Sequence, residues 1–422
     1  MADAVLLLKG FWYDVLMQTI TIQGGKEKQL LRHHPWVFSK AITPGQSPEE
    51  GPCRVETSEG RFIAWGWYDE KSHIPLHLLS WDEADVIDEL WWEARIKDAV
   101  QRRARFFRDK RTTTTTFRII FSEADMLPGL VADVYGTMIR IIISSHIAWG
   151  KKDLIVRTLD GLLKPSLQVI TTDSAYTGVE SLPGGALFWK DGAYFTPDGK
   201  LPAVRFREDG LWYEVVPGMG QKSGFYCDQR DNRRAIETYC ADAVVLDAFC
   251  YTGAFTLHAL RAGARRVDCL DSSEDALRQL LYHIHLNQNE GTIPQDGRDK
   301  VTTTTCNVFE QMRSIPHNTY DVMILDPPKL AQTKSQAEAA SKAYKDLNRL
   351  AMERIKRGGI LVTFSCSGAI TSELFRTILA WSAQDAHREA QVLRILGAGE
   401  DHPIRLSFPE SEYLKGCVVR VL

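Results

Sequence analysis

Hydrophobic residues in the second half of the chain form short strand-like runs that alternate with amphipathic helical stretches. The strand-like runs, rich in Val, Ile and Leu, are 244–247, 266–270, 320–325 and 359–364. The stretches with apolar residues at helical spacing are about 253–261, 273–289 and 341–356. This β-then-α order is typical of a mostly parallel sheet with helices on both faces. The pattern therefore predicts an α/β, doubly wound domain over residues 221–422.

The first 220 residues carry a different pattern, in which aromatic and β-branched runs are separated by turn residues. Arg61–Trp67 and His73–Leu79 predict strands of a small β module over residues 19–100. Met138–Ile143 predicts a strand of a middle α+β domain over residues 101–220, which has no catalytic signature. The whole chain is thus expected to hold three domains.

A basic segment lies where the first two predicted domains meet. Residues 94–111 contain eight Lys or Arg and two Phe, which predicts a basic helix running into a linker. Such a segment is either an ordinary solvated helix face or a surface that contacts nucleic-acid phosphates. The candidate phosphate contacts are Arg102, Arg103 and Arg105.

The composition is that of an ordinary globular protein. With 422 residues, 44% hydrophobic and 25% charged, the chain is neither disordered nor collagen-like. No apolar run approaches the ~18 residues of a membrane span, and the run Ala4–Leu8 is too short for a signal-peptide core. We therefore expect a cytoplasmic protein that does not bind a membrane. The net charge of −3 does not by itself indicate a nucleic-acid partner.

The eight cysteines are scattered along the chain without any C-x-x-C pair. In a chain of this length, that distribution argues against both a zinc site and a disulfide framework. We expect most of these thiols to be reduced and buried, and we expect no metal site.

Candidate ligand-binding residues follow the first two predicted strands of the α/β domain, where doubly wound sheets bind their ligands. The first strand leads into Asp247–Gly253 (Asp-Ala-Phe-Cys-Tyr-Thr-Gly), a tight turn without the G-x-G-x-x-G fingerprint. The second leads into Asp271, whose carboxylate is suited to accept hydrogen bonds from a ribose. The alternative is that Asp271 merely precedes a helix cap, with Ser272 and Asp275 forming a capping box.

An acid and a thiol follow the next two strands. Asp326 opens the sequence Asp-Pro-Pro-Lys, whose prolines fix the backbone, and Cys366 lies in Phe-Ser-Cys-Ser-Gly. If these strands are neighbours, Asp326 and Cys366 face the same crevice. A cysteine is more often a small packing residue than a nucleophile. Its place beside Asp326 favours a catalytic thiol.

Taken together, these motifs resemble a known family. Residues 220–230 (Gly-Gln-Lys-Ser-Gly-Phe-Tyr-Cys-Asp-Gln-Arg), 326–329, 344–348 (Tyr-Lys-Asp-Leu-Asn) and 364–368 are similar to S-adenosylmethionine-dependent cytosine-5 methyltransferases of large-subunit (23S) rRNA. Residues 25–38 are similar to the start of the PUA domain that opens this family. The similarity runs from about residue 20 to the C-terminus.

The resemblance implies an architecture, a cofactor and a partner. It implies a PUA RNA-binding domain, an α+β middle domain and a Rossmann-like class I methyltransferase domain. It further implies S-adenosylmethionine as the cofactor, and as the partner large-subunit rRNA or an assembly intermediate of that subunit. Whether the chain forms a homodimer stays open.

The resemblance also implies roles for individual residues. Cys366 would attack carbon 6 of cytosine, and Asp326 would hydrogen-bond nitrogen 3. Asn307 stands where the family more often has an acid that contacts adenine. The expected cofactor contacts are Phe249, Tyr251, Thr252, Gly253, Asp271, Ser272, Asn307, Asp326 and Pro327. The candidate RNA contacts, besides the arginines of the basic segment, are Lys222, Phe225, Tyr226, Arg230 and Lys329.

Three alternatives remain at this point. The same scaffold could methylate guanine N7 of 23S rRNA without a nucleophile, and Cys366 would then be a packing residue. A non-catalytic PUA RNA-binding protein would keep the sheet without turnover, which the intact Asp326 motif and Cys366 disfavour. A small-molecule methyltransferase would have no use for a PUA domain. Lys222 and Arg230 could equally be ordinary surface cations.

Overall fold

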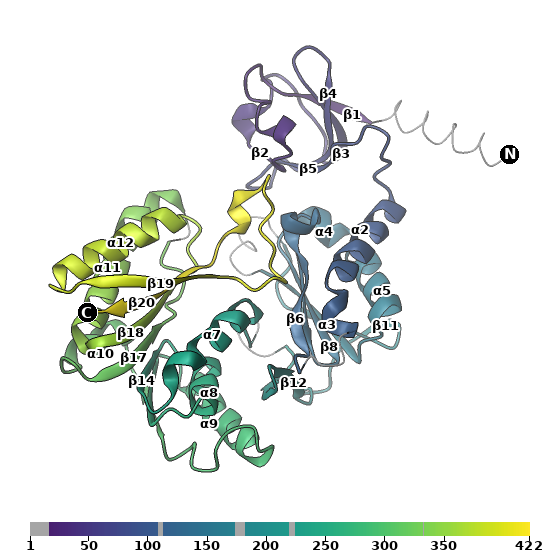
Figure 1. The fold of residues 1–422 in the computed structure, drawn as a ribbon. Helices are drawn as coiled ribbons and strands as arrows, with labels where there is room; N and C mark the ends of the chain where they lie inside the picture. Colours follow the sequence, from purple (N-terminus) through teal and green to yellow (C-terminus); the bar gives the residue numbers. More distant parts are fainter. Residues whose placement is uncertain (1–16, 109–112, 174–181, 219–223, 332) are drawn as a thin grey trace. The chain divides into compact units, whose positions relative to one another are not determined.

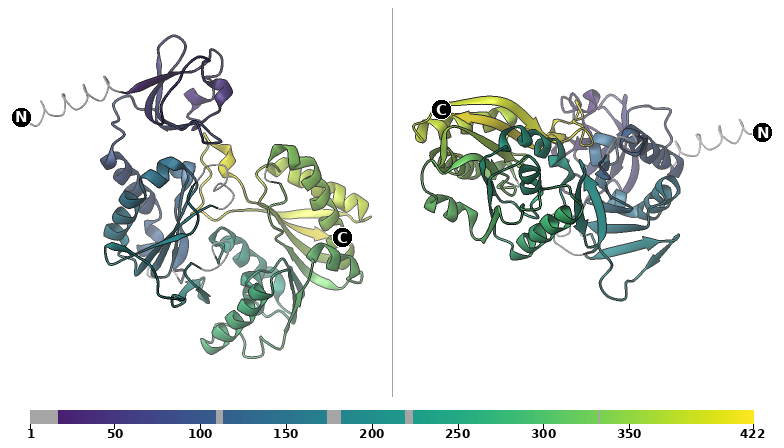
Figure 2. Two further views of the ribbon diagram at one scale, coloured as in Figure 1. Left: turned by 180° about the vertical axis from the view of Figure 1, so that it is seen from behind. Right: turned by 60° about the horizontal axis from the view of Figure 1, so that its bottom comes forward.

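A computed structural model describes residues 17–108, 113–173, 182–218, 224–331 and 333–422 (Figures 1 and 2). By its internal contacts the chain divides into two units. The first comprises residues up to 110, 117–202 and 403–411, and the second comprises 111–116, 203–402 and 412–422. The three-domain boundaries at 19–100, 101–220 and 221–422 stay predictions.

The first unit opens with a five-stranded sheet in the order β1-β3-β4-β5-β2. Alternate residues of β3 are buried, which is the period expected of a strand with one face on a core. The predicted strand 73–79 begins later, at Leu76, because Pro75 lacks the N–H that a ladder position needs. The strands are β1 (Gln18–Thr21), β2 (Trp36–Val37), β3 (Gly51–Glu56), β4 (Phe62–Tyr68) and β5 (Leu76–Ser80).

A six-stranded sheet follows in the same unit, in the order β11-β10-β9-β8-β7-β6. The predicted strand Met138–Ile143 is confirmed as β8. The other strands are β6 (Thr116–Phe121), β7 (Leu130–Tyr135), β9 (Leu167–Thr172), β10 (Ala186–Lys190) and β11 (Ala193–Phe195). The helices beside this sheet in Figure 1 are α2 (Glu89–Arg102), α3 (Ala104–Arg108), α4 (His146–Gly150) and α5 (Lys152–Leu163).

The second unit holds a seven-stranded sheet in the order β16-β15-β14-β17-β18-β20-β19. The first five of these are parallel to one another, and β20 is antiparallel to both β18 and β19. This confirms the expected doubly wound sheet. The strands are β14 (Val244–Ala248), β15 (Arg266–Asp271), β16 (Val301–Thr305), β17 (Tyr320–Leu325), β18 (Ile355–Ser365), β19 (Ala390–Gly397) and β20 (Lys415–Val421).

Helices cover both faces of this sheet (Figure 1). The strand order reverses between β14 and β17, so the carboxyl ends of these two strands mark the edge where ligands bind. Among the described residues, no helix is long and apolar enough to cross a membrane. The helices on one side are α7 (Arg230–Cys240), α8 (Ala254–Arg261) and α9 (Glu274–Asn289), and those on the other are α10 (Val308–Ser314), α11 (Ala337–Arg354) and α12 (Ser372–Asp385).

One boundary differs from the sequence pattern. The apolar stripe predicts a helix through residue 356, but α11 ends at Arg354 and β18 begins at Ile355. Ile355 also fits the apolar stripe of the helix, but it pairs with Tyr320 of β17 and is fully buried in the strand. Strand pairing in the sheet therefore outweighs the helical spacing of apolar residues at this position.

A buried ion pair fastens the hairpin of β12 (Val204–Glu208) and β13 (Leu211–Val215) to helix α7. Arg233 donates from Nε and Nη2 to the two carboxylate oxygens of Glu208, at 2.6 and 2.7 Å. Burial alone would raise the pKa of Glu208, but Arg233 and His258 hold that pKa below its ordinary value. Bidentate pairs of this kind are strong, and breaking one leaves a charge stranded in the core.

We expect Arg233→Met to lower the free energy of unfolding by about 3–5 kcal/mol, because it removes the bidentate partner of the buried Glu208 carboxylate. The matched control is Arg234→Met, which breaks the neighbouring Arg234–Asp209 pair, whose arginine is 57% exposed. That exposed pair is worth at most about 1 kcal/mol. Urea denaturation of both variants measures the difference, and equal losses would contradict this account.

Candidate cofactor and catalytic site

The loop between β14 and α8 has an unusual backbone. Phe249, Tyr251 and Gly253 all have positive φ, at 63°, 50° and 81°. Left-handed backbone is costly for residues with a side chain, and such strain gathers at ligand sites. At Gly253 a Cβ would lie 2.3 Å from Cγ of Leu280, so only glycine fits that position. The predicted cofactor loop is therefore a strained turn packed directly on helix α9.

Asp271, at the end of β15, holds this loop in place. One carboxylate oxygen accepts the N–H of Tyr251 at 2.9 Å, and the other accepts the N–H of Ser273 at 2.8 Å. A carboxylate has about four lone-pair sites, so acceptor capacity remains for hydroxyl groups. The predicted capping box is wrong by one residue, because the N-cap of α9 is Ser273 and Ser272 is an exposed neighbour.

Asp247 is a residue of this edge to which the sequence analysis assigns no role. It is fully buried at the end of β14, and one of its oxygens accepts the hydroxyl of Thr256 at 2.6 Å. Its other oxygen has no hydrogen-bond partner in the described part of the chain. Burial raises the pKa of Asp247 to about 7, against the hydrogen bonds from Thr256. The sequence signal that could have identified Asp247 is an acid at the end of the first strand-like run of the α/β domain.

The remaining predicted cofactor residues surround the same loop. Asn307 is exposed and caps helix α10, accepting the N–H of Phe309 at 3.1 Å. The ring centroid of Phe309 lies 5.4 Å from that of Phe249, and this contact joins the start of helix α10 to the loop after β14. Thr252 is buried, and its carbonyl lies 3.0 Å from a ring nitrogen of His283. Contact of these residues with a cofactor stays a prediction.

The expected meeting of Asp326 and Cys366 rests on neighbouring strands. Strand β17 pairs with β18 in parallel, with Leu325 opposite Thr363. The thiol of Cys366 lies 3.9 Å from the carbonyl oxygen of Pro327, the residue after Asp326. Both Asp326 and Cys366 are partly exposed. The acid and the thiol therefore stand at one edge of the sheet, as the sequence predicts.

The surroundings of Asp326 make it a weak acid. Burial raises the pKa of Asp326 to about 7, and the nearby carboxylate of Asp228 adds to the effect. A hydrogen bond with Gln229 and the charge of Arg233 act in the opposite direction. Near neutral pH a large fraction of Asp326 is therefore protonated and able to donate a hydrogen bond. Asp228 and Gln229 are site residues that the sequence analysis does not single out.

Tyr226 is one predicted RNA contact that the structure leaves on the surface of this site. Its side chain is 39% exposed, and its ring lies 5.6 Å from that of Tyr251. Its carbonyl accepts a hydrogen bond from Arg233 at 2.7 Å, which fixes the backbone beneath the ring. Lys329 is also exposed, and Lys222 lies outside the described residues.

Two predicted RNA contacts are wrong, because their side chains are buried. Phe225 is 2% exposed and packs against Phe206 and Tyr213, with ring centroids at 5.0 and 4.6 Å. Arg230 is 2% exposed and donates to the buried carboxylate of Asp401 at 2.8 Å. Both side chains hold the fold together and cannot reach a polynucleotide.

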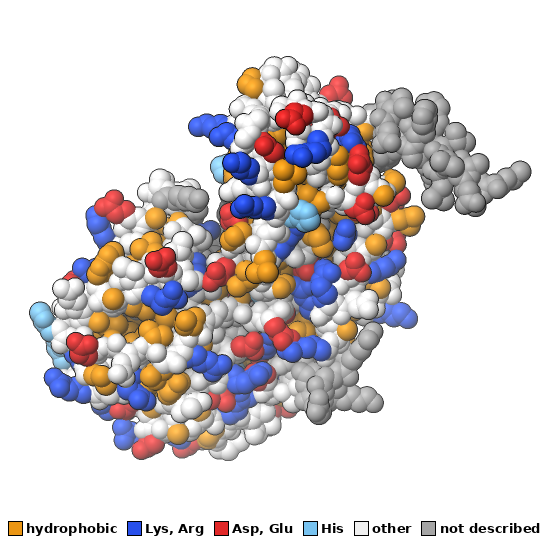
Figure 3. All heavy atoms as spheres, turned by 45° about the horizontal axis from the view of Figure 1, so that its top comes forward, with side chains coloured by type: hydrophobic (Ala, Val, Ile, Leu, Met, Phe, Trp, Pro, Cys, Tyr) orange, Lys and Arg blue, Asp and Glu red, His pale blue; other side chains and the backbone are white. Residues whose placement is uncertain are grey.

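The basic segment also differs from expectation. It forms two helices rather than one, interrupted at Arg103, which is 3% exposed and pairs with Asp125 at 2.7 Å. A phosphate contact by Arg103 is therefore excluded. Arg102 pairs with the same Asp125 at 3.1 Å but is partly exposed, and Arg105 is exposed with its guanidinium 4.9 Å from the ring centroid of Phe106. On the face drawn in Figure 3, basic and acidic side chains are interspersed.

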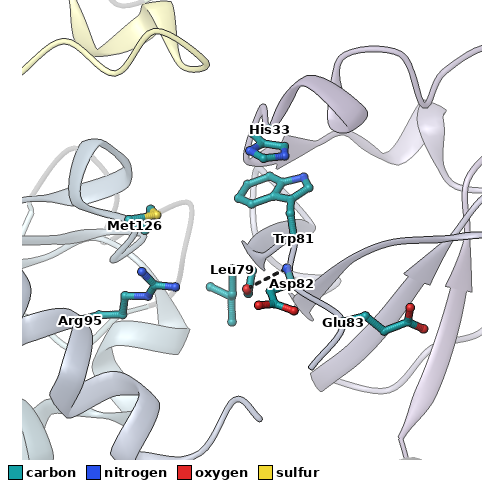
Figure 4. Close-up of a pocket in the computed structure, with 8 residues that line it drawn as sticks. His33, Leu79, Trp81, Asp82, Glu83, Arg95 and Met126 are labelled. Atoms are coloured by element: carbon teal, nitrogen blue, oxygen red, sulfur yellow. Dashed lines mark hydrogen bonds between the residues drawn. The ribbon is translucent and has the colours of Figure 1, made fainter. Parts of the chain in front are cut away.

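A hollow of about 460 Å³ lies in the first unit, lined by residues that include Trp81, Asp82, Glu83 and Arg95 (Figure 4). The rings of His33 and Trp81 stack on each other with centroids 4.8 Å apart. Two carboxylates and one guanidinium do not make a strongly basic lining. The lining of this hollow therefore does not favour phosphate binding.

Comparisons with known proteins agree with this architecture. Residues 20–81 match the PUA-like domain family, and residues 191–411 match a family of S-adenosylmethionine-dependent methyltransferases. A ribosomal RNA large subunit methyltransferase I from Aeromonas hydrophila is 36% identical over 406 residues, covering 95% of this chain and 99% of the relative. Its counterpart from Klebsiella pneumoniae is 33% identical over 418 residues, covering 97% and 100%.

Solved structures resemble the fold over nearly the whole chain. A candidate methyltransferase solved in complex with SAH has a TM-score of 0.80 at 19% identity, covering 96% of this chain and 100% of that one. An S-adenosylmethionine-dependent methyltransferase candidate from Streptococcus mutans has a TM-score of 0.79 at 18% identity, with the same coverage. At these identities the likeness concerns the fold.

We expect Gly253→Ala to weaken S-adenosylmethionine binding at least about tenfold, because the new Cβ must displace Leu280 and with it the strained loop. The control is Gly263→Ala, where φ is +86° but a Cβ would meet nothing within 4 Å. That variant carries the backbone strain without the clash. Isothermal titration calorimetry gives both affinities, and a Gly253→Ala protein that binds as tightly as Gly263→Ala would contradict the assignment.

Proposed function

Since the chain belongs to the ribosomal RNA large subunit methyltransferase I family, we propose that it methylates carbon 5 of a cytosine in 23S rRNA through a covalent adduct with Cys366. Its methyltransferase domain is S-adenosylmethionine-dependent. The observation that carries the proposal is the partly exposed thiol of Cys366 beside the Asp326 motif, 3.9 Å from the Pro327 carbonyl. A methyltransferase of a more nucleophilic atom has no need for such a thiol.

The residues of the sheet edge suit S-adenosylmethionine. Asp271 keeps acceptor capacity for the ribose hydroxyls after its two backbone hydrogen bonds. The ring of Phe249, which meets that of Phe309 edge to face, offers adenine an apolar surface. The amide of Asn307 offers it a polar group. Asp326 and Pro327 would border the methionine end. When bound, S-adenosylmethionine supplies an electrophilic methyl group.

Carbon 5 of cytosine is a poor nucleophile, so the protein must first raise its electron density. The thiolate of Cys366 adds to carbon 6, forming a sulfur–carbon bond and pushing an electron pair through the ring toward nitrogen 3. Asp326 in its protonated form donates its proton to nitrogen 3 and neutralises the developing charge. Carbon 5 then behaves as an enamine carbon and takes the methyl group. Loss of the carbon 5 proton to solvent as the sulfur–carbon bond breaks releases Cys366 as a thiolate. Return of the nitrogen 3 proton to the carboxylate of Asp326 restores the ring.

The substrate base must leave its stack to reach this edge, so the target is single-stranded or flipped. Tyr226 offers an exposed ring next to Tyr251 on which a flipped base can stack. The PUA-like domain and the exposed side chains of Arg105 and Lys329 are the proposed contacts to RNA phosphates.

The first test is the identity of the product. Large-subunit rRNA from a strain that lacks the gene is incubated with the protein and labelled S-adenosylmethionine, digested to nucleosides and analysed by mass spectrometry. 5-Methylcytidine supports the proposal. 7-Methylguanosine would indicate that Cys366 is a packing residue. The absence of any labelled nucleoside, with both rRNA and its precursor particles as substrates, would overturn the rRNA assignment.

We expect Cys366→Ala to lower the rate of methyl transfer by roughly 10³-fold or more, because the nucleophile is lost. RNA that carries 5-fluorocytosine at the target should form a stable covalent adduct with the wild-type protein, visible as a band shift on a denaturing gel. The control is Cys306→Ala, since Cys306 is another partly exposed thiol. Full activity of Cys366→Ala would sink the covalent mechanism.

We expect kcat/KM to fall as the pH rises through about 7, because Asp326 must be protonated and its pKa is raised to about 7. Asp326→Asn should remove this descending limb and lower the rate roughly a hundredfold or more. Asp228→Asn should move the limb to lower pH, because the Asp228 carboxylate helps to raise the pKa of Asp326. If kcat/KM of Asp326→Asn still falls above pH 7, the titrating group is not Asp326 and the prediction is wrong.

A further inference from the structure

A buried lysine, Lys415, lies close to Cys366, and it has no role in the mechanism proposed above. Lys415 begins strand β20 and is only 4% exposed. In the antiparallel pairing of β18 with β20 it stands opposite Ser365. Its Nζ donates to the carbonyl oxygen of Ser367 at 2.9 Å. The amine therefore contacts the residue that follows Cys366, and Lys415 pairs across the ladder with the residue that precedes it.

The surroundings of Lys415 do not favour a charged amine. Burial is the main cause that lowers the pKa of Lys415 to about 8, and the positive charge of Lys329, which follows β17, contributes in the same direction. Negative charge on Glu412, just before β20, and on Cys366 acts in the opposite direction. Glu412 also accepts a hydrogen bond from Ser372 at 2.6 Å. Ionisation of Cys366 would thus supply an anion to this amine from within the site itself.

The backbone around Cys366 is held firmly enough for such a pair to persist. The hydroxyl of Ser367 accepts the N–H groups of Leu330 and Ala331, both at 3.1 Å. It also lies 3.1 Å from the hydroxyl of Tyr344. These contacts tie the segment that carries Cys366 to the segment that follows the Asp326 motif.

We propose that Lys415 is a positioning residue that keeps Cys366 ionised as a thiolate. The S–H bond breaks, its electron pair stays on sulfur, and the proton moves to the lone pair of Nζ. The product is a thiolate–ammonium pair, and the ammonium keeps one N–H on the Ser367 carbonyl. A cation beside a thiol is the arrangement that favours thiolate in reactive cysteines. The inference rests on the proposed function in that the thiolate is the nucleophile of the methyl transfer.

The direct test is the pH dependence of alkylation of Cys366 by iodoacetamide, followed by mass spectrometry of the peptide that contains it. In the full-length protein, K415M should move the midpoint of the alkylation profile upward by one pH unit or more. K415R retains the charge and should keep the midpoint at or below that of the wild type. The control K356M removes a lysine from the opposite end of β18, where it pairs with Asp321, and should leave the midpoint unchanged.

A second variant covers the case in which K415M fails to fold. K415Q is neutral but retains an N–H group for the Ser367 carbonyl, so it separates loss of charge from loss of that hydrogen bond. It should shift the midpoint as K415M does. An unshifted midpoint in a K415Q or K415M protein that melts cooperatively would overturn the inference.

Methyl transfer gives an independent readout. K415Q should lower kcat at least tenfold relative to the wild type at pH 7. This difference from the wild type should narrow at pH 9, where thiols ionise without help and both proteins lose the proton of Asp326 alike. If Cys366→Ala retains activity, the proposed function fails, while the alkylation profiles still decide the role of Lys415. If 5-methylcytidine forms and the midpoint in K415Q stays at the wild-type value, only the inference about Lys415 fails.

Discussion

The arrangement of the site depends on one buried guanidinium. Arg233 binds both oxygens of Glu208 and the carbonyl of Tyr226, so a single side chain joins the β12–β13 hairpin, helix α7 and the segment before it. Its guanidinium also lies 4.8 Å from the ring centroid of Phe225. This junction sets where Tyr226 emerges and where Asp228 and Gln229 meet Asp326. The electrostatics of the acid therefore follow from a structural ion pair that touches no substrate.

Around Cys366 the protein shifts two acid–base groups toward neutrality from opposite directions. Burial raises the pKa of Asp326 to about 7 and lowers the pKa of Lys415 to about 8. Groups whose environments move their pKa values in this way are typical of sites that transfer protons. In the proposed chemistry the roles are complementary, because Asp326 gives a proton to the base while Lys415 takes one from the nucleophile. The same loss of solvent produces both shifts.

The part of the site that lies on parallel strands could be predicted from the sequence. Buried β-runs alternating with helices determine which strand ends share an edge, so Asp326 and Cys366 are brought together by topology alone. The predicted RNA-binding arginines are different, because an arginine that pairs with a distant carboxylate looks the same in a sequence as one that faces RNA. Arg230 meets Asp401, and Arg103 meets Asp125. Lys415 was missed for a related reason, since it lies on an antiparallel strand that the β-then-α pattern does not include.

The two interpretations of Asp271 offered by the sequence, ribose ligand or neighbour of a helix cap, do not exclude each other. Its carboxylate already binds the N–H groups of Tyr251 and Ser273. The first of these steadies a loop in which Phe249, Tyr251 and Gly253 all have left-handed backbone, a conformation that persists only where surrounding contacts impose it. Loss of cofactor binding on removal of Asp271 would therefore combine a missing ligand with a relaxed loop. Because Gly253→Ala disturbs the loop while leaving the carboxylate in place, comparing the two substitutions separates these contributions.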